Sequence, residues 1–427
     1  MCQQQQSHSS RSESKVAAAE DGTRSDEPFP WDGGVFDAHC HPTDTMSSIA
    51  SIPGMRARTL TIMATRSQDQ DLVASVASQH GIQSRAALTS ASQSDGRVVP
   101  AFGWHPWFSY QLYDDALPAG KATYDPSSGD MTSQKARHYR AVLNPEPDPS
   151  FIASLPDPAP LSSFLSATRS RLQAHPLALV GEVGLDKIFR LPEAWADGER
   201  ERKREDEGLT AGGREGRRLS PHNVGMAHQA GVLRAQLRLA AELGRAVSVH
   251  GVQAPGVLFD LLQSTWKGHE RLSRRERRMV AAGAEDFSES SGDEDEGEGG
   301  GEGGSNGERR EPTARAKPYP PRICLHSFSA PVEVMKQYLN PSIPARIFFS
   351  FSVVVNLSTA GGEKRFPEMI RACPDDQLLI ESDVHCAGED MDHYLEHMYR
   401  KVCEIKGWTL QEGVERVRKN YEEFVFG

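Results

Sequence analysis

The chain has 427 residues, of which 37% are hydrophobic and 25% are charged, a composition typical of a soluble globular protein with some non-globular segments. Its net charge of −11 comes mostly from residues 285–311, where eleven Asp or Glu and two Arg give −9, so the rest of the chain accounts for only −2. The chain as a whole is therefore not basic, unlike many nucleic-acid-binding proteins. Contact with nucleic acid would need a local basic patch or bound cations.

The cysteines and the N-terminal segment indicate a reducing compartment. The six cysteines form no Cys-x-x-Cys pair, and their pattern does not resemble a disulfide framework. Residues 1–30 consist mainly of Gln, Ser and charged residues without the apolar centre of a signal peptide, and no apolar run approaches the length of a membrane span. We therefore expect a cytosolic or nuclear protein that does not contact membranes.

Four polar segments are predicted to lie outside the folded core. Residues 1–30 have the composition of a disordered tail, and polar insertions are expected at 110–150, 191–222 and 269–317, the first of them irregular. The third insertion is interpreted as a solvated linker, with a nuclear-import-like patch or a phosphorylated acidic segment as functional alternatives. The remaining roughly 270 residues are close to the ~250 of a (β/α)8 barrel. We expect one barrel domain over 31–427.

Eight short apolar runs follow one another along this domain and are predicted to be strands. They cover residues 34–39, 59–65, 98–103, 177–182, 246–250, 322–326, 346–352 and 377–383. The runs do not alternate with polar residues, as expected for parallel strands with both faces covered. Apolar residues at helical spacing predict helices over 228–244 and 411–426. This alternation predicts an α/β fold, a (β/α)8 TIM-type barrel, rather than an open doubly wound sheet.

Seven histidines and carboxylates lie at or near the ends of these runs. They are Asp37, His39 and His41 on the first run, Glu182 on the fourth, His250 on the fifth, His326 on the sixth and Asp383 on the eighth. The strand C-termini of a barrel meet at one face, where such groups would repel one another or stay unsatisfied without a cation. A single His-x-His pair or strand-end histidine is more often incidental or part of a core. Five strand ends that each carry a ligand-type side chain predict a metal site.

Six motifs in chain order carry a family resemblance. They are Phe36-Asp37-Ala38-His39-Cys40-His41, Gly103-Trp104-His105-Pro106, Gly181-Glu182-Val183-Gly184-Leu185-Asp186, Val249-His250, Leu325-His326-Ser327-Phe328-Ser329 and Ile380-Glu381-Ser382-Asp383. With these motifs the sequence resembles the TatD-type deoxyribonucleases of the amidohydrolase-like metal-dependent hydrolases, and more narrowly a fungal TatD-like branch. The resemblance covers residues 33–427 without the three insertions, and it is more specific for the family than for a substrate.

The resemblance implies two divalent metal ions. One would be held by His39, His41 and Asp383 and the other by His250 and His326, with Glu182 bridging both and counting as a catalytic residue. Such a pair of ions could activate water and neutralise the oxygens of a phosphodiester. Imidazole-rich ligation favours Zn²⁺ or Mn²⁺, although the carboxylates are also compatible with Mg²⁺.

Further roles follow for Asp383 and for residues near the ligands. The resemblance implies that His105 lies beside the scissile phosphate. Asp383, in contact with the activated water, would be the proton acceptor, and Asp37 would steady the site without binding metal. The aromatic residues Trp104 and Trp107-Phe108 are interpreted as loop packing, with base stacking at the barrel mouth as the alternative.

The chain departs from the family pattern at two places. After the fifth-strand histidine, family members commonly carry Ser-Arg, whereas this chain has Gly251-Val252-Gln253, so an arginine able to pair with phosphate is missing there. After Asp383 the family usually has a small residue and Pro, whereas Val384-His385-Cys386 follow here. His385 is an additional candidate ligand, with a role away from the metal as the alternative.

We therefore predict a divalent-metal-dependent phosphodiester hydrolase, a TatD-type deoxyribonuclease with 3′→5′ exonuclease-like character and DNA as its substrate. Two alternatives stay open. The missing arginine favours a metal-dependent hydrolase of a small ester, amide or lactone. A protein-interaction scaffold would instead bind a partner through the barrel surface and the insertions, a role described for some fungal relatives. The sequence indicates no oligomeric state.

Overall fold

The structure is a computed structural model. It describes residues 27–427 except for 90–95, 119, 128, 196–209, 211–215 and 273–316. Most of the predicted tail, most of the second insertion and nearly all of the third therefore lie outside the described residues. No helix in the described part of the chain is long and apolar enough to cross a membrane.

Eight parallel strands form one sheet, which confirms the predicted barrel. They are β1 (Phe36–Cys40), β2 (Thr59–Met63), β3 (Val98–Phe102), β7 (Leu179–Asp186), β9 (Val247–Val252), β10 (Arg322–Leu325), β11 (Arg346–Phe351) and β12 (Leu378–Ile380), paired in this order. The ring closes just beyond β12. The amide of Asp383 donates to the carbonyl of His39 at 3.0 Å, and the amide of His41 donates to the carbonyl of Val384 at 2.8 Å. An open doubly wound sheet has no such contact between its first and last strands.

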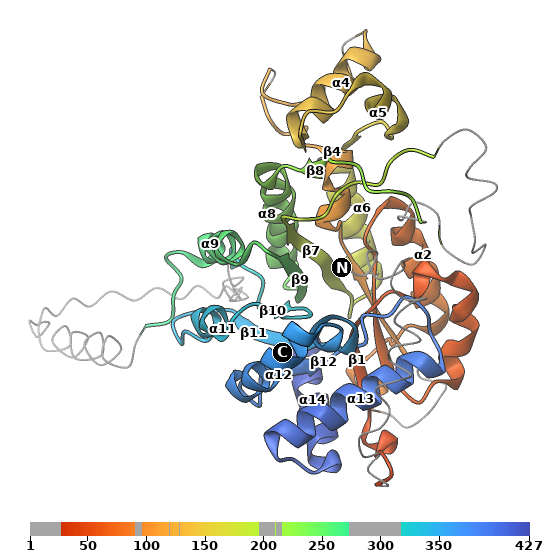
Figure 1. Ribbon diagram of the computed structural model, residues 1–427, viewed down its shortest axis with the longest axis vertical. Helices are drawn as coiled ribbons and strands as arrows, with labels where there is room; N and C mark the ends of the chain where they lie inside the picture. Colours follow the sequence, from red (N-terminus) through yellow and green to blue (C-terminus); the bar gives the residue numbers. More distant parts are fainter. Residues whose placement is uncertain are drawn as a thin grey trace, which may run out of the picture.

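Helices surround the barrel (Figure 1). They are α2 (Ser67–His80), α3 (Arg85–Thr89), α6 (Leu161–Ala174), α8 (Met226–Glu242), α9 (Pro255–Trp266), α11 (Val332–Tyr338), α12 (Ala360–Ala372), α13 (Glu389–Lys406) and α14 (Leu410–Phe426). The helices predicted over 228–244 and 411–426 are thus present as α8 and α14, each shifted by about two residues or less, a normal uncertainty for helix ends.

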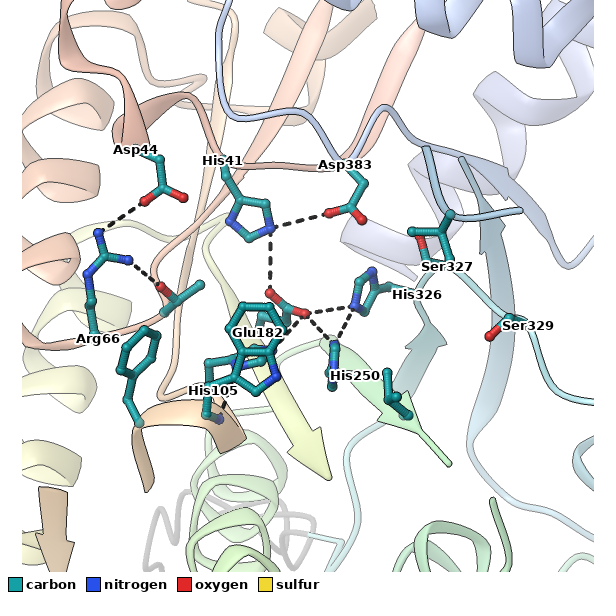
Figure 2. Close-up of a pocket in the computed structure, with 16 residues that line it drawn as sticks. His41, Asp44, Arg66, His105, Glu182, His250, His326, Ser327, Ser329 and Asp383 are labelled. Atoms are coloured by element: carbon teal, nitrogen blue, oxygen red, sulfur yellow. Dashed lines mark hydrogen bonds and ion pairs between the residues drawn. The ribbon is translucent and has the colours of Figure 1, made fainter. Parts of the chain in front are cut away.

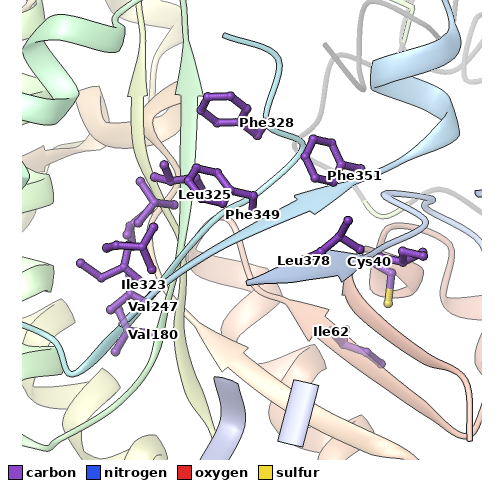
Figure 3. Packing of buried hydrophobic residues seen from close by; sticks show 14 of the residues in the cluster. Cys40, Ile62, Val180, Val247, Ile323, Leu325, Phe328, Phe349, Phe351 and Leu378 are labelled. Atoms are coloured by element: carbon purple, nitrogen blue, oxygen red, sulfur yellow. The ribbon is translucent and has the colours of Figure 1, made fainter. Parts of the chain in front are cut away.

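The strands are apolar on both faces because each face packs against something. Outward-facing residues such as Ile62, Val180 and Val247 pack against the surrounding helices (Figure 3). Inward-facing residues form a second cluster, into which α14 inserts Tyr421 and Phe424. The helix therefore fills one end of the barrel with side chains, while the other end carries the polar residues described below.

The first insertion was predicted to be irregular, and this prediction is wrong. The segment forms a small helical lobe beside the barrel (Figure 1). It contains α4 (Met131–Val142) and α5 (Pro149–Ser154), and the pair β5 (Leu143–Asn144) and β8 (Asn223–Val224) joins it to the segment before α8. The side chain of Asp130 caps α4 by accepting the amide of Ser133 at 2.9 Å. Three short elements, β4 (Leu112–Tyr113), β6 (Ala159–Pro160) and the 3-10 helix η5 (Pro106–Gln111), connect the lobe to the barrel.

Replacing Thr409 by alanine is expected to lower the free energy of unfolding by about 1 kcal/mol, because an N-cap that satisfies helix amides is lost. Thr409 Oγ1 accepts the amide of Glu412 at 3.2 Å, and Glu412 Oε2 accepts the amide of Thr409 at 2.9 Å. Urea denaturation measures the change. Thr132→Ala is the matched control, since Thr132 is exposed in the first turn of α4, where alanine is a better helix former. Equal losses in the two variants would contradict the capping role.

Candidate metal centre

Glu182 lies at the centre of a pocket at the open end of the barrel, and its two carboxylate oxygens face different neighbours (Figure 2). Oε2 is 3.5 Å from Nε2 of His39 and 3.5 Å from Nε2 of His41. Asp383 Oδ1 lies 3.4 Å from His41 Nε2 and 4.0 Å from His39 Nε2. These three residues, His39, His41 and Asp383, are called the first ligand group.

The other carboxylate oxygen of Glu182 faces a second set of imidazoles. Oε1 is 2.8 Å from Nδ1 of His250 and 2.7 Å from Nε2 of His326, and these two nitrogens are 3.2 Å apart. His250 and His326 are called the second ligand group. One carboxylate, on β7, therefore lies between two clusters of nitrogen and oxygen donors that come from four other strands or strand ends.

The strand register is irregular at two of the candidate ligands. Across residues 37–40 of β1 and 180–183 of β7, each strand advances by three residues while its neighbour advances by two. An extra residue of this kind lets consecutive side chains escape the strict alternation of a strand, and such irregularities are common next to active sites. His39 and Glu182 lie within these two segments. Asp383 lies beyond the end of β12, in a left-handed conformation with φ 55.

The electrostatics of the pocket favour ionised carboxylates. Burial would raise the pKa of Glu182, but the surrounding imidazoles, His105 first among them, hold that pKa well below its usual value. Burial likewise opposes ionisation of Asp383, but the hydrogen bond with His41 and the nearby imidazoles lower its pKa to about 2. Two buried carboxylates among imidazole nitrogens form the donor set that divalent transition-metal ions prefer, so these residues fit a metal centre.

His105 contacts the same carboxylate but is arranged as a hydrogen-bond donor. Its Nδ1 accepts the amide of Trp107 at 3.1 Å, which leaves the proton on Nε2, 3.2 Å from Glu182 Oε1. Burial lowers the pKa of His105 to about 4, so the ring is neutral near pH 7. Although ring and carboxylate atoms of His105, Glu182 and His250 lie within 4.8 Å of one another, a protonated Nε2 suits an anionic oxygen better than a cation.

Comparison with known proteins shows the family of the chain. The model of the TatD-related DNase family matches residues 36–426. The chain belongs to this family. It is similar to the Cut9-interacting protein scn1 of Schizosaccharomyces pombe, with 34% identity over 92% of this chain and 98% of that protein. It is also similar to the uncharacterized deoxyribonuclease YMR262W of Saccharomyces cerevisiae, with 23% identity over 92% of this chain and 99% of that protein.

Among solved structures, the TatD homologue YJJV of Escherichia coli superposes with a TM-score of 0.47 at 13% identity, over 92% of this chain and 97% of that one. The family match and the clustered donors together identify the chain as a metal-dependent hydrolase of TatD type. The resemblance read from the six sequence motifs is thereby confirmed.

Three histidines have a partner on the ring nitrogen that faces away from Glu182. His39 Nδ1 is 2.9 Å from Ser248 Oγ, His250 Nε2 is 3.2 Å from Asp186 Oδ2, and His326 Nδ1 is 3.5 Å from Glu381 Oε1. Such partners fix the ring orientation and the nitrogen that is left for a metal ion. Ser248, Asp186 and Glu381 were not among the site residues predicted from the sequence. Strand spacing offered a signal for Ser248, which precedes His250 by two residues and therefore shares its face.

Asp37 links the first strand to the segment that follows the last. It is fully buried, and its carboxylate accepts the hydroxyl of Ser382 at 2.5 Å, the amide of Ser382 at 3.0 Å and the amide of His39 at 3.0 Å. Burial raises the pKa of Asp37 to about 7 in spite of these hydrogen bonds. The contacts place Asp37 behind the first ligand group, where it holds the backbone of His39.

The aromatic residues in and just after the Gly103–Pro106 motif have two different surroundings. Trp104 packs edge-on against Phe164, with ring centroids 5.0 Å apart. Trp107 and Phe108 instead line the pocket. The indole of Trp107 is fixed by a hydrogen bond from Nε1 to Asp186 Oδ2 at 2.7 Å. The pocket thus has an immobilised aromatic wall next to His105.

The two departures from the family pattern lie differently in the structure. Gly251 and Val252 line the pocket, so the wall beside the second ligand group carries no cation at that point. His385 is exposed and lies outside the donor clusters found in the described residues. The buried thiol of Cys40 contacts the carbonyl of Thr61 at 3.4 Å rather than the pocket, although it adjoins two ligands in sequence.

Proposed function

We propose that the chain is a divalent-metal-dependent phosphodiesterase that hydrolyses DNA, with 3′→5′ exonuclease-like character. The observation that carries the proposal is the division of the Glu182 oxygens between the first and second ligand groups, which suits two ions bridged by one carboxylate. The family match and the name of the relative YMR262W, an uncharacterized deoxyribonuclease, support DNA as the substrate class.

Each group of residues has a chemical task in this proposal. Two ions bound to the ligand groups, Zn²⁺ or Mn²⁺ more readily than Mg²⁺, would supply activated water and neutralise phosphate charge. Asp383, ionised at neutral pH, accepts the proton of the attacking water. His105 donates its Nε2 proton in a hydrogen bond to a phosphate oxygen, and Asp186 keeps His250 oriented. Trp107, whose ring stacks on Phe189 with centroids 4.4 Å apart, forms a fixed apolar wall beside the substrate.

The test uses the full-length protein freed of metal by a chelator and then supplied with Mn²⁺, Zn²⁺ or Mg²⁺. We expect cleavage of single- or double-stranded DNA only after a metal is restored. Labels at the 5′ or 3′ end of the DNA report the polarity, and 3′→5′ trimming shortens a 5′-labelled strand in single-nucleotide steps. DNA that stays intact with all three metals would refute the nuclease proposal.

Two other functions are supported by particular observations. The pocket wall without a cation at Gly251 and Val252 favours a hydrolase of a small neutral ester, amide or lactone. The similarity to a protein named for its interaction with Cut9 favours an interaction role, through the barrel surface or the insertions. Elemental analysis separates these alternatives, because a protein that cleaves no DNA but retains stoichiometric metal fits the small-molecule hydrolase, and one without metal affinity fits the scaffold.

A further inference from the structure

The proposed substrate carries a negative charge on every phosphate, and the pocket contains one guanidinium that the proposed chemistry has not used. Among the described pocket-lining residues, Arg66 is the only lysine or arginine. It lies on the side of the pocket opposite Ser327 and Ser329 (Figure 2). We propose that Arg66 is the phosphate-binding cation of this enzyme. A phosphate of the substrate then binds beside the end of β2 rather than beside the end of β9. The inference rests on the proposed function and names a residue that recognises its substrate.

Arg66 is held in place by rigid surroundings. It follows β2, precedes α2, and is only 3% exposed. Its guanidinium lies over the ring of Phe108, 5.5 Å from the centroid. Nη1 contacts Asp69 Oδ2 at 3.1 Å and Thr65 Oγ1 at 3.2 Å, and Nη2 contacts Asp44 Oδ1 at 3.2 Å. The cation is therefore fixed before any substrate arrives, which reduces the entropy lost on binding.

The two carboxylates that contact Arg66 have different surroundings. Asp69 is 1% exposed and also accepts the amide and the hydroxyl of Thr65, so it belongs to the framework that positions the arginine. The side chain of Asp44 is 27% exposed and lines the pocket. A carboxylate in that place repels an incoming phosphate and competes with it for Nη2. Asp44 therefore occupies the anion-binding side of Arg66 while the substrate is absent.

Removing the charge of Arg66 and removing the charge of Asp44 are expected to have opposite effects on substrate affinity. If Arg66 binds phosphate, removing its charge weakens substrate binding, whereas removing the charge of Asp44 strengthens it. If the pair only ties the turn at Asp44 to the β2–α2 connection, both changes impair the protein in the same direction. The sign of the Asp44 effect therefore decides between substrate recognition and structural support.

The experiment compares the wild-type full-length protein with Arg66→Gln, Arg66→Lys and Asp44→Asn, all saturated with Mn²⁺. Steady-state kinetics use bis(4-nitrophenyl) phosphate as the charged substrate and 4-nitrophenyl acetate as the neutral one. A fluorescent dT4 with phosphorothioate linkages reports binding without relying on turnover. Lys187→Gln is the matched control, because Lys187 is exposed and adjoins the pocket strand β7 without lining the pocket.

We expect Arg66→Gln to raise the KM for the phosphodiester and the Kd for dT4 by about ten- to a hundredfold, the usual effect of losing a hydrogen bond to a charged group. The KM for the neutral ester should not change. Arg66→Lys should fall between wild type and Arg66→Gln, because lysine keeps the charge but not the planar fork. Asp44→Asn should lower both constants, and Lys187→Gln should change them by less than about twofold, since exposed charges are screened.

Several results would overturn the assignment. If Arg66→Gln binds dT4 as the wild type does, or if Asp44→Asn weakens binding, Arg66 is a structural residue, and cleavage of DNA by the wild type would still uphold the proposed function. If the wild type itself neither binds dT4 nor cleaves DNA, both proposals fail. Because Asp44→Asn retains the arginine, it decides the question even if Arg66→Gln does not fold.

Discussion

Replacing Glu182 by glutamine is expected to weaken binding at both ligand groups at once. Its two oxygens lie 2.7–3.5 Å from nitrogens of His39, His41, His250 and His326, so this one carboxylate contacts both groups. Glutamine keeps the shape but loses the negative charge and one acceptor oxygen. We expect each ion to bind at least about 100-fold more weakly, because residues that merely orient ligands already change affinity by about 10–100-fold.

The bridging role is measured by elemental analysis of the protein after gel filtration in metal-free buffer, followed by titration against a competing chelator. Wild type should retain two ions per chain and Glu182→Gln neither. Glu193→Gln is the matched control, because Glu193 is an exposed glutamate outside the pocket. A Glu182→Gln protein that keeps one ion at wild-type affinity would show that the two oxygens do not serve two ions.

The barrel could be predicted from the sequence because its strands are buried on both faces. Apolar runs of strand length separated by helical patterns leave few other folds, and all eight runs became strands of the sheet. The first insertion was misjudged because its helix depends on contacts that composition does not show. Tyr139 and Val142 of α4 are buried against Ile152 and Leu191, so tertiary packing stabilises a helix in a stretch rich in Pro, Asp and Ser.

For the candidate site, the sequence predicted the candidate ligands but not the residues that orient them. The reason lies in strand register. Residue type and position at strand ends were enough to select His250 and His326, because parallel strands bring their ends together. The residues that orient them were missed, since a contact such as that between Asp186 and His250 depends on an irregularity in β7 that no spacing rule reveals. Arg66 was missed for a simpler reason. It lies in a connection after β2 and belongs to no motif.

Replacing Asp383 by asparagine is expected to lower kcat about 10²- to 10⁴-fold at saturating metal, because a general base is removed. Asparagine is the mildest replacement here. The residue has a φ of 55, a left-handed conformation that Asn and Asp adopt more readily than other non-glycine residues. The hydrogen bonds that close the barrel, from the amide of Asp383 to His39 and from His41 to Val384, involve only the backbone and should persist.

The asparagine variant also separates the two tasks assigned to Asp383. As a ligand of the first group only, it should weaken one ion and leave the ion at His250 and His326 in place, which the same elemental analysis detects. Raising the Mn²⁺ concentration should then restore the metal content but not kcat. Asp71→Asn is the control, because Asp71 is an exposed aspartate paired with Arg171 at 2.6 Å. This change should leave both the metal content and kcat at their wild-type values. If saturating metal restores kcat as well, Asp383 acts as a ligand alone. A group other than Asp383 must then accept the proton of the attacking water.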